Sequence, residues 1–288
     1  MTTTVTGTER GMTDDAATDS YLLGRSAAET RRLMFQGDFQ APYTRRFFED
    51  AGIGPGMRVL DVGSGAGDVA FLAADLVGPR GAVVGIDLNA RVLDTARERA
   101  RAAGLTQVGF VAGDLAADAP DGPFDAVVGR LVLLYQPDPA AALWALARRV
   151  RPGGIVAFQE YSFHAASLAQ FPPTPLWGRV YGWLRAGFLA AGVDEYIGYR
   201  LASLYRDAGL PMPHLQMSAA VGGGADWGGY EYAALTLRSA LPALTKFGIV
   251  TAEEVDIDTL ADRLRAETLA AGGLVKTPDL VGAWARVE

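Results

Sequence analysis

The sequence predicts a doubly wound α/β domain with a parallel sheet, and three observations carry this prediction. Short apolar runs alternate with helical patterns between Arg58 and Tyr161; the runs are RVLDV, AVVGID, QVGFVA, FDAVVG and GIVAFQEY. A glycine-rich turn, VGSGAG, follows the first run and opens a helix. The second and third runs lead to Asp87 and Asp114. The carboxyl ends of parallel strands share one sheet edge, so these features predict a ligand site there.

The composition restricts the function classes. The chain has 288 residues, of which 50% are hydrophobic, and a formal net charge of −7, which argues against binding along a nucleic-acid backbone. It has no cysteine, and its 2 histidines lack the spacing of a zinc site, so we expect no protein-built metal site. No apolar window is long enough to span a membrane, and the N-terminus lacks an apolar signal segment. We therefore expect a cytoplasmic protein that contacts no membrane.

The N-terminal segment is expected to be helical after a polar tail. Residues 1–20 lack hydrophobic periodicity, which predicts disorder. Ser26 and Glu29 have the spacing of a helix capping box. The pattern predicts a helix from there to a break at Gly37, followed by a second helix that opens near Pro42.

The C-terminal half changes rhythm and predicts helical insertions and two further strands. Apolar residues at helical spacing indicate helices from Trp177 to Phe188 and from Ile197 to Ala208. HLQMSAAV and LVGAWARV are typical of strands, and the stretch between them is helical, with Thr251 as a helix cap. The expected units are a tail over 1–20, a helical cap over 21–54, a ligand-binding core over 55–165, a helical insertion over 166–213, and two strands with inserted helices over 214–288.

The glycine turn departs from the dinucleotide fingerprint. In G-x-G-x-x-G the third glycine lies against a pyrophosphate, and here Asp68 stands in that position after Gly63 and Gly65. A carboxylate at this helix N-terminus disfavours NAD and FAD. Asp87, about twenty residues after the turn, is placed to accept hydrogen bonds from a ribose diol. Asp87 and Asp114 each have the alternative role of capping the next helix.

The ordered series VLDVGSGAGD, VVGIDLN, FVAGDLA, FDAVVGRLVLLYQPDP and VRPGGIVAFQEYS resembles the class I S-adenosylmethionine-dependent methyltransferases. The resemblance covers about Arg58 to Ser162, and YLLGRSAAETRRL is more loosely similar to the cap of bacterial small-molecule members. It implies a Rossmann-like seven-stranded sheet in the order 3-2-1-4-5-7-6, with the last strand antiparallel. It also implies S-adenosyl-L-methionine as the cofactor, which has no pyrophosphate, so a carboxylate at Asp61 or Asp68 would lie near its ammonium and sulfonium.

The same resemblance implies particular cofactor contacts. The glycine turn would lie against the methionine part, and Asp87 would hold the ribose hydroxyls. Asp114 would accept from the adenine amino group, and the leucines that follow these two aspartates would lie beside the adenine. Arg130 would pair with the cofactor carboxylate, with a surface ion pair as the alternative. The implied cofactor-binding residues are therefore Gly63, Ser64, Gly65, Asp87, Leu88, Asp114, Leu115 and Arg130.

An aromatic acceptor pocket is expected between the N-terminal cap and the segment after the fifth run. Aromatic residues are frequent in both segments and would suit a planar, apolar acceptor. Trp177, Tyr181 and Phe188 share one helix face, which favours a core role for them. The residues predicted to bind the substrate are Phe35, Phe39, Phe163 and Trp183.

Three residues are candidates for catalysis. Glu160 and His164 flank the end of the fifth run, where side chains project toward the ligand edge, and either would serve as a general base for an acceptor that loses a proton. Each has a supporting polar role as its alternative. Tyr21 would direct its hydroxyl at the sulfonium or the acceptor.

The leading hypothesis is transfer of a methyl group to a small aromatic or heteroaromatic metabolite, as in natural-product tailoring. The nearest resemblance within the family is to the indole C3-methyltransferases of bacterial diketopiperazine alkaloid assembly. Phenol O-methylation, amine N-methylation and quinone C-methylation are open alternatives. A nucleic-acid methyltransferase is less favoured, since the fourth strand ends in VVGRLVLLY rather than in an NPPY-type motif. A non-catalytic cofactor-binding regulator is a further, less favoured alternative. The helical additions are compatible with a homodimer.

Overall fold

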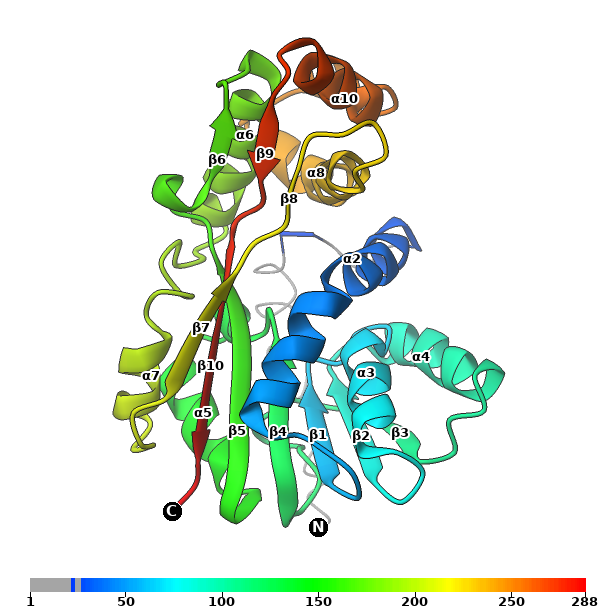
Figure 1. Cartoon of the computed structure of the whole chain (residues 1–288), viewed down its shortest axis with the longest axis vertical. Coiled ribbons are helices and arrows are strands. Elements are labelled where there is room, and N and C mark those ends of the chain that lie inside the picture. Colours follow the sequence, from blue (N-terminus) through cyan, green and yellow to red (C-terminus); the bar gives the residue numbers. More distant parts are fainter. Residues whose placement is uncertain (1–21, 24–26) are drawn as a thin grey trace, which may run out of the picture.

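The computed structural model describes residues 22–23 and 27–288. Its centre is a seven-stranded sheet with the order β3-β2-β1-β4-β5-β10-β7 (Figure 1). The strands are β1 (Arg58–Val62), β2 (Ala82–Asp87), β3 (Val108–Ala112), β4 (Phe124–Arg130), β5 (Val150–Ser162), β7 (His214–Ser218) and β10 (Asp279–Arg286).

The strand directions confirm the predicted topology. The first five strands of the chain pair in parallel, and β10 runs antiparallel to both β5 and β7. β10 is the seventh predicted strand and β7 the sixth, so the observed order is the expected 3-2-1-4-5-7-6. The carboxyl ends of β1, β2, β3, β4 and β5 therefore open on one edge.

Helices cover both faces of this sheet. One apolar core lies under α2 and α3 and includes Phe47, Phe48 and Ala70, while the other lies under α5 and α7 and includes Leu143 and Tyr205. Among the described residues, no helix combines the length and apolarity that crossing a membrane would need. The helices are α2 (Ala27–Ala51), α3 (Asp68–Val77), α4 (Ala90–Ala102), α5 (Pro139–Ala147), α6 (Pro175–Ala190), α7 (Leu201–Asp207), α8 (Gly229–Lys246), α9 (Ala252–Val255) and α10 (Leu260–Ala270).

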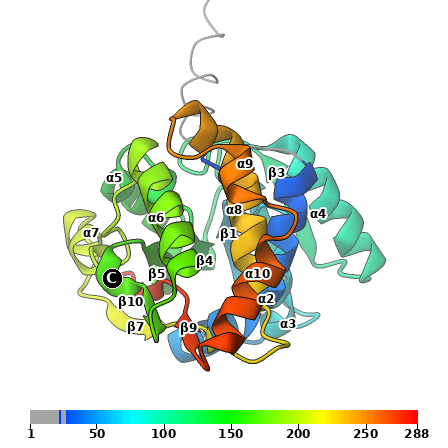
Figure 2. The same ribbon diagram turned by 90° about the horizontal axis from the view of Figure 1, so that it is seen from above.

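A helical cap rises above the carboxyl edge of the sheet (Figures 1 and 2). α8 packs against α2, α6 and α10. Next to these helices is a three-stranded sheet, β6-β9-β8, that the sequence did not predict. Its strands are only two or three residues long: β6 (Ala169–Phe171), β8 (Val221–Gly222) and β9 (Leu274–Lys276). The inserted segment between β7 and β10 holds the helices α8, α9 and α10, as predicted, and also the strands β8 and β9; Thr251 caps α9.

The predicted break at Gly37 is wrong, because α2 is one continuous helix that contains both Gly37 and Pro42. The glycine serves packing rather than a turn. A Cβ placed on Gly37 would lie 2.3 Å from Cγ of Asp68, the first residue of α3. The close crossing of α2 over α3 therefore requires a residue without a side chain at this point. Ser26, the predicted cap, lies outside the described residues.

We expect Gly37→Ala to lower the free energy of unfolding by about 1–3 kcal/mol, because the added methyl group overpacks the α2–α3 contact. Gly182 in α6 offers a matched control, since a Cβ there meets nothing within 4 Å. Gly182→Ala should raise stability by about 0.5–1 kcal/mol through its higher helix propensity. Urea denaturation measures both changes. A Gly37→Ala protein as stable as the Gly182→Ala protein would refute this account of the crossing.

Candidate active site

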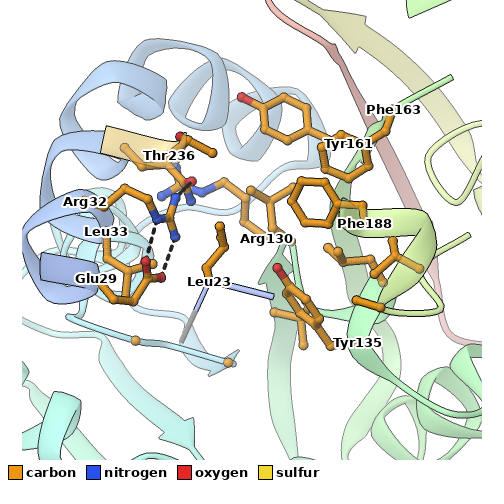
Figure 3. A pocket seen from close by; sticks show the side chains of 18 of the residues that line it. Leu23, Glu29, Arg32, Leu33, Arg130, Tyr135, Tyr161, Phe163, Phe188 and Thr236 are labelled. Carbon is orange, nitrogen blue, oxygen red and sulfur yellow. Dashed lines mark hydrogen bonds and ion pairs between the residues drawn. The ribbon is translucent and has the colours of Figure 1, made fainter. Parts of the chain in front are cut away.

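A cavity of about 730 Å³ lies between the carboxyl edge of the sheet and the helical cap. Its wall comes from α2, the glycine turn, the segments after β2, β3 and β4, the end of β5, α6 and α8. This volume is in the range of small-molecule and cofactor sites. Figure 3 shows Glu29, Arg32 and Leu33 of α2 on one side of the cavity and Phe163 and Phe188 on the other.

The glycine turn forms one end of the cavity and is held by Asp87. Gly63 and Gly65 both have positive φ values, 64° and 52°. A Cβ on Gly63 would lie 2.5 Å from Cγ2 of Val132, so the turn also approaches the β4 loop closely. One oxygen of Asp87 accepts from the Gly65 amide at 2.9 Å, and the other accepts from the Asn89 amide at 2.8 Å. The carboxylate thus fixes the turn while it lines the cavity.

Asp114 and the two predicted leucines lie at the same end. Asp114 lines the cavity, and its Oδ1 accepts from the amides of Ala116 and Ala117 at 2.9 and 2.8 Å. It therefore caps the turn that follows β3, the alternative role considered for it. Leu88 and Leu115 line the cavity as well, Leu88 exposed and Leu115 buried.

Near the glycine turn, several buried side-chain atoms have no regular hydrogen-bond partner among the described residues. Both carboxylate oxygens of Asp61, the Nε of Arg130 and the Oγ of Ser64 have no such partner among the described residues. Arg130 lines the cavity, whereas Asp61 and the predicted cofactor contact Ser64 are buried and lie outside its wall. Another nitrogen of the Arg130 guanidinium, Nη1, donates a hydrogen bond to the hydroxyl of Thr44 at 3.0 Å. Burial raises the pKa of Asp61 well above its usual range, although Arg130 opposes the shift.

This set of groups matches an α-amino acid. Asp61 and Arg130 project from adjacent strands, β1 and β4, toward the same face of the sheet, beneath α2. Buried polar groups are normally hydrogen-bonded, so the Asp61 carboxylate oxygens and the Arg130 Nε, which lack such bonds, indicate a ligand that supplies them. The ammonium and carboxylate of a methionine moiety have the required signs, and the acidic residue at Asp87 fits a ribose. The described residues therefore fit S-adenosylmethionine.

Asp68, one of the two carboxylates expected near the cofactor's ammonium, does not line this end of the cavity. Its carboxylate pairs with Arg99 of α4, with 2.8 Å between Oδ1 and Nη2, and it is not part of the cavity wall. The reason is the crossing of α2 over α3, because Gly37 lies directly against the Asp68 side chain. Asp68 still departs from the dinucleotide fingerprint. Asp61 also lies outside the cavity wall, but its carboxylate oxygens, unlike the Asp68 carboxylate, have no ion pair or regular hydrogen bond among the described residues.

The other end of the cavity is aromatic, but the aromatic residues that line it are not all the ones predicted. Trp177, Tyr181 and Phe188, for which a core role was favoured, are largely buried and also line the cavity. Phe163 lines it as predicted and stacks on Phe188 with ring centroids 4.1 Å apart. Trp183 packs against the apolar core and lies outside the cavity wall.

Phe35 and Phe39 also lie outside the cavity wall. A Cβ placed on Gly228, which precedes α8, would lie 3.6 Å from both rings, and Phe39 stacks on Tyr232 at 5.0 Å. They occupy the face of α2 that packs against α8, and the more polar face of the helix borders the cavity. Phe39 thus packs against Tyr232, and Phe35 packs against Phe39.

Glu160 supports the wall of the cavity from behind. Its side chain is fully buried, and Oε1 accepts from the amides of Val132 and Leu133 at 2.9 and 2.7 Å. Burial raises the pKa of Glu160 to about 8. These bonds hold the loop after β4, where Leu131 has a positive φ of 59° and lines the cavity. Glu160 does not itself line the cavity, so the structure gives it a positioning role.

The two remaining catalytic candidates are not brought to the cavity. His164 stacks on Tyr196 with centroids 4.6 Å apart, and its Nδ1 accepts from the Ala166 amide at 3.3 Å. It caps a short turn after β5 and is absent from the cavity wall. Tyr21 lies outside the described residues.

A buried row of polar side chains along α2 was not predicted from the sequence. Glu29 binds Arg32 through two hydrogen bonds of 2.7 Å, and Arg32 donates to Gln36 at 2.5 Å. Gln36 in turn accepts from the Tyr232 hydroxyl at 3.1 Å, and Gln40 continues the row. These positions of α2 are three or four residues apart, so they share one helix face. The spacing of these four polar residues was the available signal.

The fold and site define a Rossmann-like methyltransferase, and comparison with known proteins agrees. A family model described as "Methyltransferase domain" matches residues 53–181. Two solved structures show the same fold: the YcgJ protein of Bacillus subtilis, with a TM-score of 0.56, 16% identity and coverage of 86% of this chain and 99% of that one, and a putative methyltransferase of Bacillus halodurans, with a TM-score of 0.54, 19% identity and coverage of 84% and 97%.

Sequence relatives specify the family further. The chain is 32% identical over 168 residues to a demethylmenaquinone methyltransferase of Bacillus cytotoxicus, covering 54% of this chain and 70% of that one. It is 35% identical over 144 residues to an aklanonic acid methyltransferase of a Streptomyces strain, covering 48% and 64%. The chain therefore belongs to the S-adenosylmethionine-dependent methyltransferases. The match spans just under two thirds of the aklanonic acid enzyme.

Proposed function

We propose that this protein transfers a methyl group from S-adenosylmethionine to a small planar aromatic or heteroaromatic molecule. When bound, the cofactor supplies an electrophilic methyl group on a sulfonium. The observation that carries the proposal is the continuity of the cavity, whose single wall joins the glycine turn and Asp87 to the aromatic residues Phe163 and Phe188. One ligand can thus rest at each end, with reacting atoms facing each other and water excluded.

The residues at the cofactor end are assigned by their contacts and by the family. Asp87 would accept from the ribose hydroxyls while holding the Gly65 amide. Arg130 would bind the carboxylate through its unpartnered Nε, and Asp61 would face the ammonium. Leu88 and Leu115 would flank the adenine. Tyr21 remains a proposed acceptor-facing residue.

Three kinds of acceptor fit this class. They are an indole methylated at C3, a phenol or amine methylated on oxygen or nitrogen, and a quinone ring methylated on carbon. The relatives named after aklanonic acid and demethylmenaquinone, and a nocamycin O-methyltransferase of Saccharothrix syringae that is 39% identical over 118 residues, support the second and third kinds. The Saccharothrix match covers 41% of this chain and 42% of that one.

Product mass tests the proposed function. The protein is incubated with trideuteriomethyl-labelled S-adenosylmethionine and a panel of indoles, cyclic dipeptides, phenols and naphthoquinols. We expect at least one planar acceptor to gain a single labelled methyl group at a rate proportional to protein concentration. Labelling of none of these classes by protein that binds S-adenosylhomocysteine would contradict the proposal.

Arg130→Met should weaken S-adenosylhomocysteine binding by about 10–100-fold, the range of one lost hydrogen bond to a charged group. Binding of 5′-methylthioadenosine, which lacks the amino-acid part, should change less than about threefold. Arg206→Met provides the control, since Arg206 pairs with Asp207 on the exposed surface of α7, outside the cavity wall. Calorimetric titration measures all three proteins. Equal losses for both ligands in Arg130→Met would remove the carboxylate assignment.

A further inference from the structure

The hydroxyl groups of two cavity-lining tyrosines lie next to each other. Tyr161 comes from β5 and Tyr232 from α8, and both line the cavity. Their hydroxyl oxygens lie 3.3 Å apart. The end of β5 and a helix of the cap are thus joined by a polar contact between two residues of the cavity wall.

The hydrogen bonds around this pair leave the Tyr161 hydroxyl proton without a short acceptor. Gln40 donates its Nε2 protons to the Tyr161 hydroxyl and, at 3.3 Å, to the Tyr232 hydroxyl. Tyr232 donates its own proton to Oε1 of Gln36 at 3.1 Å. For the Tyr161 proton, the acceptor among the described residues is the Tyr232 oxygen at 3.3 Å, longer than an ordinary O–H···O bond.

Both hydroxyls stay protonated. Burial raises the pKa of Tyr161 well above its usual range and also raises that of Tyr232. Tyr161 is therefore a hydrogen-bond donor at any physiological pH rather than a base. A buried donor without a short partner favours a ligand that brings an acceptor atom.

We propose that Tyr161, oriented by Gln40 and Tyr232, donates a hydrogen bond to an oxygen of the methyl acceptor. The acceptor is then an oxygenated planar ring, such as a phenol, naphthol or quinol, whose flat surface lies against Phe163 and Phe188. An indole offers an N–H donor instead of an acceptor oxygen and would leave the Tyr161 proton unused. This inference rests on the proposed function and specifies its acceptor class.

The test compares two probes that differ by one hydroxyl, 1-naphthol and naphthalene, titrated into protein saturated with S-adenosylhomocysteine. We expect the wild-type protein to bind 1-naphthol about tenfold more tightly than naphthalene. In Tyr161→Phe the two affinities should agree within about twofold, because naphthalene binding is unchanged and 1-naphthol binding falls. In Tyr232→Phe the preference should shrink, because Tyr161 loses one of its orienting partners.

Tyr199→Phe is the matched control, since the Tyr199 hydroxyl donates to Asp279 outside the cavity at 2.6 Å. It should keep the full preference for 1-naphthol. Normal S-adenosylhomocysteine binding with equal wild-type affinities for the two probes, with no affinity for either, or with an undiminished preference in Tyr161→Phe would overturn the inference. A wild-type protein that fails to bind S-adenosylhomocysteine would instead reject the proposed function.

Discussion

Asp87→Ala is expected to weaken S-adenosylhomocysteine binding by about 100-fold or more. The change removes the proposed acceptor of the ribose hydroxyls. It also leaves the amides of Gly65 and Asn89 without the carboxylate that holds them, so the glycine turn loses its fixed shape. Isothermal titration of the variant measures the loss, and thermal unfolding without ligand measures how far the fold itself is weakened.

An aspartate on the surface of α4 gives the comparison. Asp94 is largely exposed and pairs with Arg97 on the same helix. Asp94→Ala should bind S-adenosylhomocysteine as the wild-type protein does, because a surface ion pair of this kind contributes little. An Asp87→Ala protein that binds within about twofold of Asp94→Ala would show that the cofactor does not rest on the end of β2.

Glu160→Gln is expected to remove a large part of the pH dependence of stability. Burial raises the pKa of Glu160 to about 8 in the folded chain, against an ordinary value of 4.5. Between these values the folded chain keeps a proton that the unfolded chain releases, so the free energy of unfolding falls as pH rises. The contribution is fully present below about pH 4.5 and is lost by about pH 8, a change of about 4–5 kcal/mol.

The glutamine variant keeps an oxygen for the Val132 and Leu133 amides and does not titrate. Urea denaturation at pH 5 and pH 8.5 should therefore show a much smaller difference for Glu160→Gln than for the wild-type protein. Glu98→Gln, on the exposed face of α4, should keep the wild-type difference. An unchanged pH dependence in Glu160→Gln would mean that this carboxyl is ionised in the folded chain.

The sequence was sufficient for the sheet and for one end of the cavity. Strand–helix alternation and the turn at Gly63 predict a parallel sheet with a site at its carboxyl edge, and local chemistry alone decides these features. Asp87 and Asp114 follow from the same pattern, because a strand end fixes where its next side chain lies. The order of the last two strands came from the family resemblance.

Features that depend on tertiary contacts were not predictable in this way. From the sequence alone, Gly37 predicts a helix break. The close packing of the Asp68 side chain against Gly37 explains why α2 contains a glycine here. Periodicity separates the buried face of α6 from its exposed face, but it cannot show that the buried face also borders a cavity. For this reason the helical spacing predicts Trp177 in the core and Trp183 in the pocket, whereas in the structure Trp177 lines the cavity and Trp183 does not.

The tyrosine pair illustrates the same limit at longer range. Tyr161 and Tyr232 are separated by 71 residues and meet only because α8 folds back over the end of β5. Single-sequence patterns carry no information on such a contact. The polar row on α2 that supports the pair, by contrast, was visible in the spacing of Gln36 and Gln40.

The crystal structure of the complex with S-adenosylhomocysteine tests the central claim most directly. We expect the adenine to lie between Leu88 and Leu115, the carboxylate to meet Arg130, and the sulfur to face Tyr161 and Phe163 across the open cavity. A complex in which the sulfur points away from the aromatic end, or in which the ligand lies outside this cavity, would contradict it.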